Sequence, residues 1–373
     1  MKNYLFILPV IPHYRFKFFK RVTEKIPNIE IMAGEHQCIG PSSLKDSKSI
    51  ASLDHNVICL MSHKIMWQKN ISISHKYKTG DVVLISGNPR ILSNYLIIIK
   101  AKIRGLKLVW FGQGWTAGSN RIRNLIKRLI MSFCDSVILY TQEEAENTKL
   151  FMSRSKKIFY INNTVDTENI FSIKNKISIE MLKDFKKNLS INDSRVLLFV
   201  GRLEGKEKLN ILLDSLVDVC SKDEKVLLIV IGNGSFLPKY KEYSVKKGIA
   251  GNIRWLGAIY SEEDLAYWFL SADCFVYPGA IGLSLLHAFS YGLPVITHNN
   301  FKNHMPEIVA LNDRYNGLLY NENNYKHLSK MIMNMISEDK IRAKYSRNAL
   351  KVVEDRFKFD QMVDRFIIAL KSN

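Results

Sequence analysis

The chain has 373 residues, 47% hydrophobic and 24% charged, which fits two ordinary globular domains rather than one. No run reaches the roughly 18 apolar residues of a membrane span. Five scattered cysteines without a CxxC pair argue against a disulfide framework or a zinc site. The net charge is +19, and residues 1–165 hold 25 Lys and Arg against 10 Asp and Glu. This basic half indicates an anionic partner, which is nucleic acid, an acidic substrate or an anionic membrane surface.

In chain order, the first half alternates apolar strands with helices. Residues 4–11 form a continuous apolar run, typical of a parallel strand covered on both faces. The run is short and polar residues follow it, so it is not expected to be a secretory signal. Further strands are predicted at 29–35, 57–62, 81–87, 106–112, 136–141 and 157–166. The repeated strand-then-helix units predict a doubly wound α/β domain over residues 1–170.

The second half repeats this pattern after a polar segment rich in Lys and Asn. We expect residues 171–192 to be a linker and residues 193–355 to form a second α/β domain. The chain ends in an amphipathic helix within 356–373. Its apolar face carries Phe359, Met362, Val363, Phe366, Ile367 and Leu370.

Three turns of the second half suit an anionic ligand. Arg202 follows a predicted strand directly, at the carboxyl end where open α/β sheets bind ligands. Its guanidinium can grip a diphosphate with two hydrogen bonds, or it can simply cap the loop. Gly232 and Gly234 let a backbone approach a ligand closely, although such a pair is often only a tight turn. The segment 282–284 opens a helix, whose free N–H groups favour an anion such as a diphosphate.

Four motifs in this order and spacing resemble the nucleotide-sugar domain of family 4 glycosyltransferases. They are GRL (201–203), IGNGS (231–235), VYPGAIGLSLLHAFSYGLPVIT (276–297) and HMPEIVA (304–310). The resemblance implies the GT-B fold, with two Rossmann-like domains facing a cleft and a final helix that crosses back to the first domain. It also implies retaining transfer from a UDP- or GDP-sugar without a cofactor. The PGxxGLxxxH form resembles a branch associated with bacterial surface polysaccharides, such as O-antigen and capsule.

The resemblance also implies roles for particular residues. Arg202 would stabilise the charge on the departing diphosphate. The family places a Lys five residues after this Arg, where Glu207 stands here; Lys206 or Lys208 would serve instead, and Lys208 is favoured. The predicted donor-binding residues are Gly201, Arg202, Lys206, Lys208, Gly232, Gly234, Gly279, Ile281, Gly282, Leu283, Ser284 and His287. The predicted catalytic residues are Arg202, Lys208 and His13.

Two positions depart from the family pattern. Most members carry two glutamates eight positions apart, where Gly279 and His287 stand here. A neutral His287 can still hydrogen-bond a ribose hydroxyl, and the backbone at 279–281 can contact the sugar. The alternative is a decayed site, so that the chain binds a nucleotide sugar without transferring it. Glu307 matches an acidic residue frequent in the family and is expected to cap or orient the loop.

The first half supplies the candidate acceptor side. His13 and Arg15 follow the first strand, and Gln113 stands where relatives often carry a His. Because Gln cannot transfer protons, acid–base chemistry is not expected at that position. His13 and Arg15 are the better acceptor-side candidates, with a structural role as the alternative. The sequence has no DxD triplet and no His/Cys cluster, so we expect no metal.

The helix at 119–133 carries an apolar stripe edged by Arg and Lys. Such a stripe is either a core face with a basic back or a face that rests on anionic lipid. The leading interpretation is a cytoplasmic enzyme at the inner face of the membrane, acting on a saccharide or an undecaprenyl-linked saccharide. Nucleic acid is disfavoured as a partner because the chain has no recognised binding motif.

Overall fold

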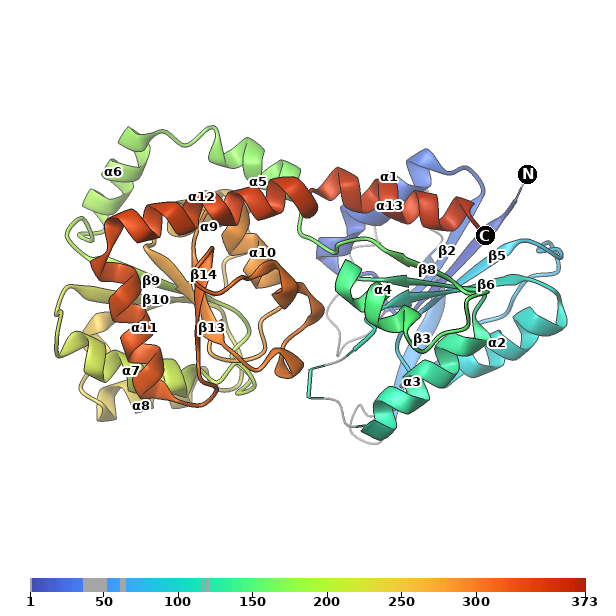
Figure 1. Cartoon of the computed structure of the whole chain (residues 1–373), viewed down its shortest axis with the longest axis horizontal. Coiled ribbons are helices and arrows are strands. Elements are labelled where there is room, and N and C mark those ends of the chain that lie inside the picture. The colour runs from blue at the N-terminus through green and yellow to red at the C-terminus, as the bar shows by residue number, and fades with distance from the viewer. Residues whose placement is uncertain (1, 36–51, 61–64, 116, 119–120) are drawn as a thin grey trace. The chain divides into compact units, whose positions relative to one another are not determined.

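The computed structural model describes residues 2–35, 52–60, 65–115, 117–118 and 121–373. The chain divides into two compact units (Figure 1). Unit 1 comprises Met1–Trp115, Ser119–Asn163 and Asp360–Asn373, and unit 2 comprises Thr116–Gly118 and Thr164–Phe359. The C-terminal segment therefore belongs to the unit in which the chain began.

Unit 1 is built on an eight-stranded sheet of order β4-β3-β2-β1-β5-β6-β7-β8. The strands are β1 (Tyr4–Leu8), β2 (Ile29–Glu35), β3 (Ser52–Leu60), β4 (Ile65–Gln68), β5 (Val82–Ser86), β6 (Lys107–Gly112), β7 (Ser136–Leu139) and β8 (Lys157–Tyr160). The paired strands run parallel except at β3 and β4, which are antiparallel. Strand β4 is an edge strand of four residues, too short for its apolar pattern to be recognised in the sequence.

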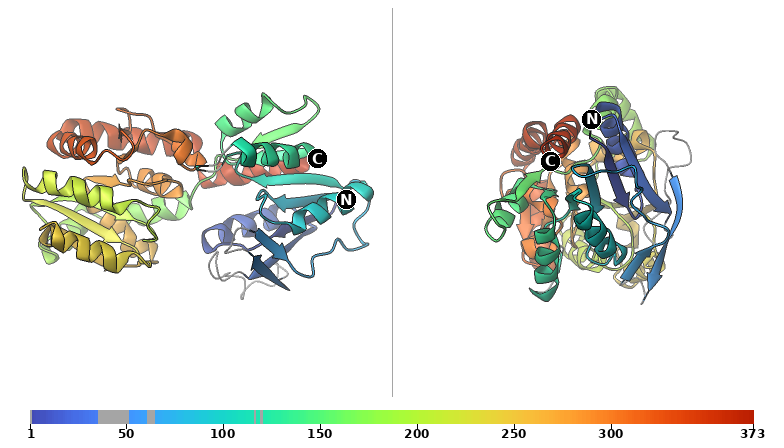
Figure 2. Two further views of the ribbon diagram at one scale, coloured as in Figure 1. Left: turned by 90° about the horizontal axis from the view of Figure 1, so that it is seen from below. Right: turned by 90° about the vertical axis from the view of Figure 1, so that its right-hand side faces the viewer.

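Helices cover both faces of this sheet (Figure 2). One face carries α2 (Ser93–Ile103), α3 (Arg121–Phe133) and α4 (Gln142–Lys149), and the other carries α1 (Phe16–Lys25) and α13 (Phe359–Lys371). On the second face Phe366 of α13 packs against Phe6 and Phe18, with ring centroids 6.0 and 5.0 Å apart. The Lys25 ammonium lies 2.8 Å from the Asp364 carboxylate and joins α1 to α13. The apolar face predicted for the last helix is thus the face that packs in unit 1.

Unit 2 contains a six-stranded parallel sheet of order β11-β10-β9-β12-β13-β14. Its strands are β9 (Arg195–Val200), β10 (Val226–Ile231), β11 (Ile253–Gly257), β12 (Cys274–Val276), β13 (Val295–His298) and β14 (Gly317–Tyr320). The chain winds outward from β9 to β11, and then from β12 to β14 on the other side. Strand order therefore reverses between β9 and β12, and ligands of such sheets bind outside the carboxyl ends of the strands at this point.

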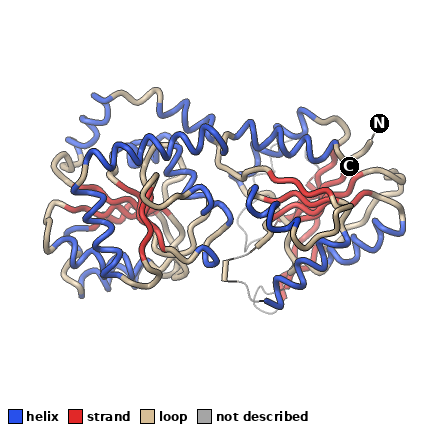
Figure 3. Tube along the Cα trace, in the orientation of Figure 1, coloured by secondary structure: helices blue, strands red, loops and turns tan. Residues whose placement is uncertain are grey.

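The sheet of unit 2 lies between two helix layers (Figure 3). One layer contains α7 (Leu209–Cys220), α8 (Leu237–Lys246) and α11 (Tyr325–Ser337), and the other contains α5 (Thr167–Lys174), α9 (Glu262–Ser271), α10 (Leu283–Ser290) and α12 (Asp339–Arg356). Side chains of β9 alternate between the layers: Leu198 packs with α9 and α10, whereas Leu197 and Phe199 pack with α7 and α11. Both faces are buried, so the strand is apolar throughout.

The structure differs from the sequence-based expectation at 171–192. This segment is not a linker: it holds the end of α5 and the whole of α6 (Ile179–Asn188), and it belongs to unit 2. The side chain of Ser178 caps α6 by accepting a hydrogen bond from Met181 N. None of the α6 side chains is fully buried. A surface helix of this kind can have a polar composition. From sequence alone, such a composition resembles that of a linker.

Candidate functional site

Three loops meet at the carboxyl edge of the unit 2 sheet. They follow β9, β10 and β12, the strands that flank the reversal of strand order. Leu203 N donates a hydrogen bond to Asn233 O at 3.0 Å, and Phe236 N donates to Leu203 O at 2.9 Å. These bonds join the loop after β9 to the loop after β10, so the GR and GNG motifs lie side by side.

Glycines allow these loops to touch backbone to backbone. Gly232 has a φ of +149°, and a Cβ there would collide with the carbonyl oxygen of Gly201. A Cβ at Gly279 would lie only 2.6 Å from Lys206 O. The position where the family carries its first glutamate thus has no room for any side chain. The three loops form a glycine-lined floor, defined here as residues 201–203, 232–234 and 279–282.

The last part of this floor is held from behind by a buried histidine. Ile281 N donates a hydrogen bond to His304 Nδ1 at 3.1 Å, and Met305 N donates to Ile281 O at 3.0 Å. His304 Nε2 lies 2.9 Å from His298 O, and since a carbonyl only accepts, Nε2 carries the proton. Burial lowers the pKa of His304 to about 4, so the ring is neutral at pH 7.

Helix α10 begins at this floor. Gly282 precedes its first residue, Leu283, and Ser284 is half-buried within its first turn. The free N–H groups of this turn are the predicted diphosphate contact. Glu307 is buried against the loop, since a Cβ at Gly282 would lie 3.7 Å from Glu307 Oε2. This position agrees with an orienting role for Glu307.

The cations near the floor differ in their surroundings. Arg202 and Lys206 are exposed. Lys208 Nζ instead donates hydrogen bonds to Glu322 Oε1 and Asn323 Oδ1, both at 2.9 Å. Lys208 is therefore tied to the loop after β14, whereas Arg202 and Lys206 extend into solvent.

The Glu322 carboxylate is the centre of a polar cluster. Burial raises its pKa, but hydrogen bonds from Lys208, Asn300 and Asn303 outweigh burial and bring the pKa of Glu322 to about 2. The carboxylate is thus ionised at pH 7 and pairs with Lys208. His298 lies nearby, and its pKa is lowered to about 3, first by burial and then by His304.

Glu207, which replaces the family's lysine, points inward. It is buried, and its carboxylate accepts hydrogen bonds from Glu204 N at 3.1 Å, Gly205 N at 3.0 Å and Tyr240 Oη at 2.8 Å. Lys208 follows with a left-handed φ of +55°. Glu207 therefore braces the loop after β9, and no cation stands at this position.

His287, the replacement for the second family glutamate, contacts a carboxylate from another helix. Its Nε2 lies 2.7 Å from Glu262 Oε1 and donates to it, because a carboxylate only accepts. Tyr291 Oη donates to the same oxygen at 2.6 Å. Burial raises the pKa of Glu262, but the two hydrogen bonds and the electrostatic interaction with His287 outweigh burial, so the pKa is lowered overall. A carboxylate is therefore present beside position 287 after all.

Sequence reasoning missed Glu262. It is the first residue of α9, in a run of three acids that reads as an ordinary capped helix start. The available signal was a partly buried histidine on α10 that needs an acceptor. Locating that acceptor requires the packing of α9 beside α10, which spacing along the chain does not show.

The candidate acceptor-side residues lie at the carboxyl edge of the unit 1 sheet. His13 is exposed in a short helix, His13–Arg15, that follows β1. Arg15 is buried, and its guanidinium lies 5.1 Å from the Tyr140 ring centroid and 5.6 Å from that of Phe18. Its packing with aromatic rings favours the structural alternative for Arg15. Gln113 is half-buried directly after β6.

Glu144 orders the loop that contains Gln113. It is buried on α4, and Oε1 accepts hydrogen bonds from Gly114 N at 2.6 Å and Trp115 N at 3.2 Å. In the sequence Glu144 has the pattern of an ordinary helix cap, since it forms a capping box with Thr141, so its second role could not be predicted.

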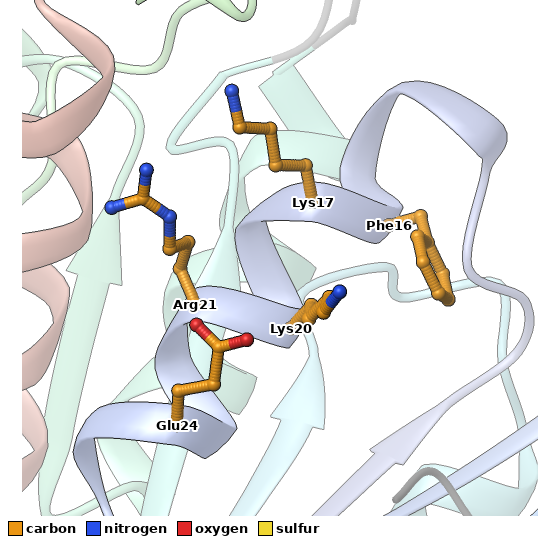
Figure 4. A pocket seen from close by; sticks show the side chains of 5 residues that line it. All are labelled: Phe16, Lys17, Lys20, Arg21 and Glu24. Carbon is orange, nitrogen blue, oxygen red and sulfur yellow. The ribbon is translucent and has the colours of Figure 1, made fainter. Parts of the chain in front are cut away.

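The structure contains two further hollows, one in each unit. A shallow pocket on α1 is lined by Phe16, Lys17, Lys20, Arg21 and Glu24 (Figure 4). The second, which includes Asp273 and Arg342, lies at the amino end of β12, opposite the floor. Within the described ranges no group of three or more His, Cys, Asp or Glu is placed to hold a metal ion. No helix among those residues is long and apolar enough to cross a membrane.

The two Rossmann-like units give the protein the GT-B fold. Over its full length the chain resembles HepE of Anabaena, solved in complex with UDP, with a TM-score of 0.75 at 15% identity; the match covers 100% of both chains. Residues 180–352 match the family model of glycosyl transferases group 1. The matched residues all lie within unit 2.

Two curated relatives are similar over most of their length. An uncharacterized glycosyltransferase of Methanocaldococcus jannaschii is 24% identical over 304 residues, which cover 77% of this chain and 74% of that protein. The N,N'-diacetylbacillosaminyl-diphospho-undecaprenol alpha-1,3-N-acetylgalactosaminyltransferase of Campylobacter jejuni is 22% identical over 268 residues. That match covers 70% of this chain and 67% of the enzyme.

Proposed function

We propose that this protein is a retaining, metal-independent glycosyltransferase that moves a sugar from UDP- or GDP-sugar to a saccharide acceptor. The acceptor is undecaprenyl-linked, and the reaction serves O-antigen or capsule synthesis at the inner face of the cytoplasmic membrane. The observation that carries the proposal is the glycine-lined floor, which includes exposed Arg202, at the strand-order reversal of unit 2. The UDP complex of HepE and the lipid-linked substrate in the name of the Campylobacter enzyme support it.

In this proposal the chain stabilises the leaving group. The bond between the anomeric carbon and the diphosphate oxygen breaks, and the oxygen of an acceptor hydroxyl bonds to that carbon. Negative charge builds on the diphosphate oxygen, and the proton of the acceptor hydroxyl leaves with the diphosphate. Arg202 and the first-turn N–H groups of α10 offset this charge, with Lys206 or Lys208 as the second cation. A pre-formed floor lowers the barrier because its donors need no rearrangement when the charge develops. No general base is assigned.

The ribose is held by His287 together with Glu262. His287 Nε2 already donates a hydrogen bond to Glu262. The Glu262 carboxylate is therefore the group that accepts hydrogen bonds from the ribose hydroxyls. No carboxylate side chain fits at position 279. The sugar is therefore contacted by the backbone at 279–281. His13 and Gln113 of unit 1 belong to the acceptor side, with His13 as the exposed polar contact.

A second candidate function is nucleotide-sugar binding without transfer. Two observations favour it: Gly279 carries no carboxylate, and Glu207 replaces the phosphate-binding lysine with an inward-facing acid.

One experiment separates the two functions. Thermal shift with a panel of UDP- and GDP-sugars is followed by mass spectrometry of an added mix of glycan and lipid-linked acceptors. We expect stabilisation by one nucleoside diphosphate class and an acceptor mass gain of one sugar. Binding without any product would select the second candidate. No binding of any nucleotide would overturn both.

A further inference from the structure

Helix α3 of unit 1 has its apolar residues on the outside. Leu125 is 68% exposed, and Ile122, Ile126, Leu129 and Phe133 are exposed along the same stripe. The buried side of the helix consists of Lys127, Ile130 and Met131. A lysine inside and leucines outside reverse the pattern of a helix that meets water. Most of this stripe is therefore not a buried core face, which was one of the two interpretations of its sequence.

Helix α2 shows a second exposed stripe. Leu92 at its amino end, Leu96, Ile99 and Ile103 are all exposed, and Ile103 reaches 81%. Their spacings of four, three and four residues place them on one face of the helix. The opposite face, with Ile97, Ile98 and Ala101, already packs on the sheet. Helix α2 thus has two apolar faces, one packed on the sheet and one exposed.

The two stripes belong to one surface. Helix α2 joins β5 to β6 and α3 joins β6 to β7, so right-handed crossovers place them next to each other on the same face (Figure 1). Lys102 Nζ lies 2.9 Å from Asp135 Oδ2 and ties their carboxyl ends together. The Arg128 guanidinium lies 3.9 Å from the ring centroid of exposed Phe151, which adds the turn after α4. We call these exposed residues the α2–α3 surface.

The charged side chains of α2 and α3 are all positive. Neither α2 nor α3 contains an Asp or Glu. Exposed cations flank the apolar stripes: Lys100 on α2, and Arg121, Arg123 and Arg128 on α3. The surface is therefore an aliphatic centre with a basic edge, within the half of the chain that holds most of the net charge.

These charges select the kind of partner. A second copy of the chain would oppose this surface with the same cations, and like charges repel. Nucleic acid would match the cations but would leave the exposed leucines and isoleucines without an apolar partner. An anionic bilayer matches both, because phosphates lie at the level of the cations and acyl chains lie beneath them.

We propose that the α2–α3 surface docks unit 1 on an anionic lipid bilayer, with its aliphatic side chains entering the boundary between headgroups and acyl chains. The docking is independent of the transferase chemistry. It would bring the protein to an acceptor whose lipid is anchored in the same membrane.

The test is co-sedimentation of the full chain with phosphatidylcholine vesicles, with and without phosphatidylglycerol. We expect binding to the phosphatidylglycerol vesicles that weakens as salt is raised.

Two pairs of substitutions test the apolar stripes: Leu125→Glu with Leu129→Glu, and separately Ile99→Glu with Ile103→Glu. Each pair should lower the partition coefficient by about tenfold or more. Ile179→Glu on α6 is the matched control, since Ile179 is also 68% exposed, and it should bind as the wild type does. Arg121→Gln with Arg128→Gln should weaken binding to the anionic vesicles alone.

All replaced side chains are exposed, so circular dichroism and melting temperature should match the wild type and exclude misfolding. Undiminished binding of the two glutamate pairs would overturn the proposal, as would a wild-type chain that ignores anionic vesicles. A dimer in solution that the same glutamates dissociate would assign the surface to a second copy instead. These measurements contain no donor or acceptor, so a failure of the proposed transfer leaves their outcome unaffected.

Discussion

Glycine 279 and histidine 287 show how single positions can change while a site keeps its form. Gly279 lies against the backbone of Lys206 and Glu207, so no side chain fits there. His287 does not stand alone, since it shares the carboxylate of Glu262 with Tyr291. A negative charge lost at one position of α10 is thus supplied from α9. This arrangement favours an altered donor site over a decayed one.

At this scale we predict that Glu262→Gln raises the KM for the nucleotide sugar by about tenfold, with a smaller effect on kcat. The substitution keeps the size of the side chain but removes the charge offered to the ribose, a contact made equally in the ground and transition states. Steady-state kinetics with a fixed acceptor measures both constants. Glu263→Gln, next to it and exposed, is the control and should leave KM unchanged. An unchanged KM in Glu262→Gln would remove Glu262 from the donor site.

The sequence predicted the location of those candidate residues that follow one strand or open one helix. Arg202, Gly232 and the Gly282 helix start are of this kind, because each directly follows a recognisable apolar strand or opens a helix. The partners of Lys208 and His287 were not predictable. Glu322 and Glu262 come from loops and helices distant along the chain, and only the packing of these elements brings them together.

Among elements, the loop after β14 is connected to the start of α7 through Glu322. Its carboxylate accepts hydrogen bonds from Lys208 at 2.9 Å and from Asn303 at 3.0 Å. With a pKa of about 2 against an ordinary 4.5, Glu322 stabilises the folded state above about pH 4.5. This contribution is lost as the pH falls from about 4.5 toward about 2, because the unfolded chain binds the proton first.

We therefore predict that Glu322→Gln lowers the free energy of unfolding at pH 7 by on the order of 2–3 kcal/mol. Below pH 4.5 the difference in unfolding free energy between Glu322→Gln and the wild type should narrow by about 1 kcal/mol per pH unit. Urea unfolding followed by tryptophan fluorescence at pH 7, 4.5 and 3.5 measures it. Glu224→Gln, an exposed carboxylate, is the control and should follow the wild type. A destabilisation that does not change with pH would show that the charge of Glu322 does not stabilise the folded state.

The apolar runs predicted most strands, because buried parallel strands are apolar on both faces. Helix α6 was not predicted, since it lies on the surface and its composition resembles that of a linker. For α3 the sequence indicated the stripe but not its orientation. The stripe faces outward because Lys127, Ile130 and Met131 are the residues that face the sheet, and periodicity alone cannot choose between the two faces.

For the whole molecule, the repeated strand-then-helix order was enough to predict two doubly wound sheets, and the GT-B fold agrees with that prediction. The basic surplus of the first half has a structural counterpart in unit 1, where the α2–α3 surface and the pocket on α1 gather cations. Unit 2 carries the glycosyltransferase group 1 match and the glycine-lined floor. We infer that donor chemistry belongs to unit 2 and membrane contact to unit 1.

We propose above that Arg202, a residue of the glycine-lined floor, promotes sugar transfer. The most direct measurement is the rate of transfer by the wild type and by Arg202→Ala, with the donor that the screen identifies. We predict that kcat falls about 100- to 1,000-fold in Arg202→Ala, because one stabilising donor to the leaving diphosphate is lost. The melting temperature should not change, since Arg202 is exposed. Transfer at the wild-type rate by Arg202→Ala would show that Arg202 does not stabilise the leaving diphosphate.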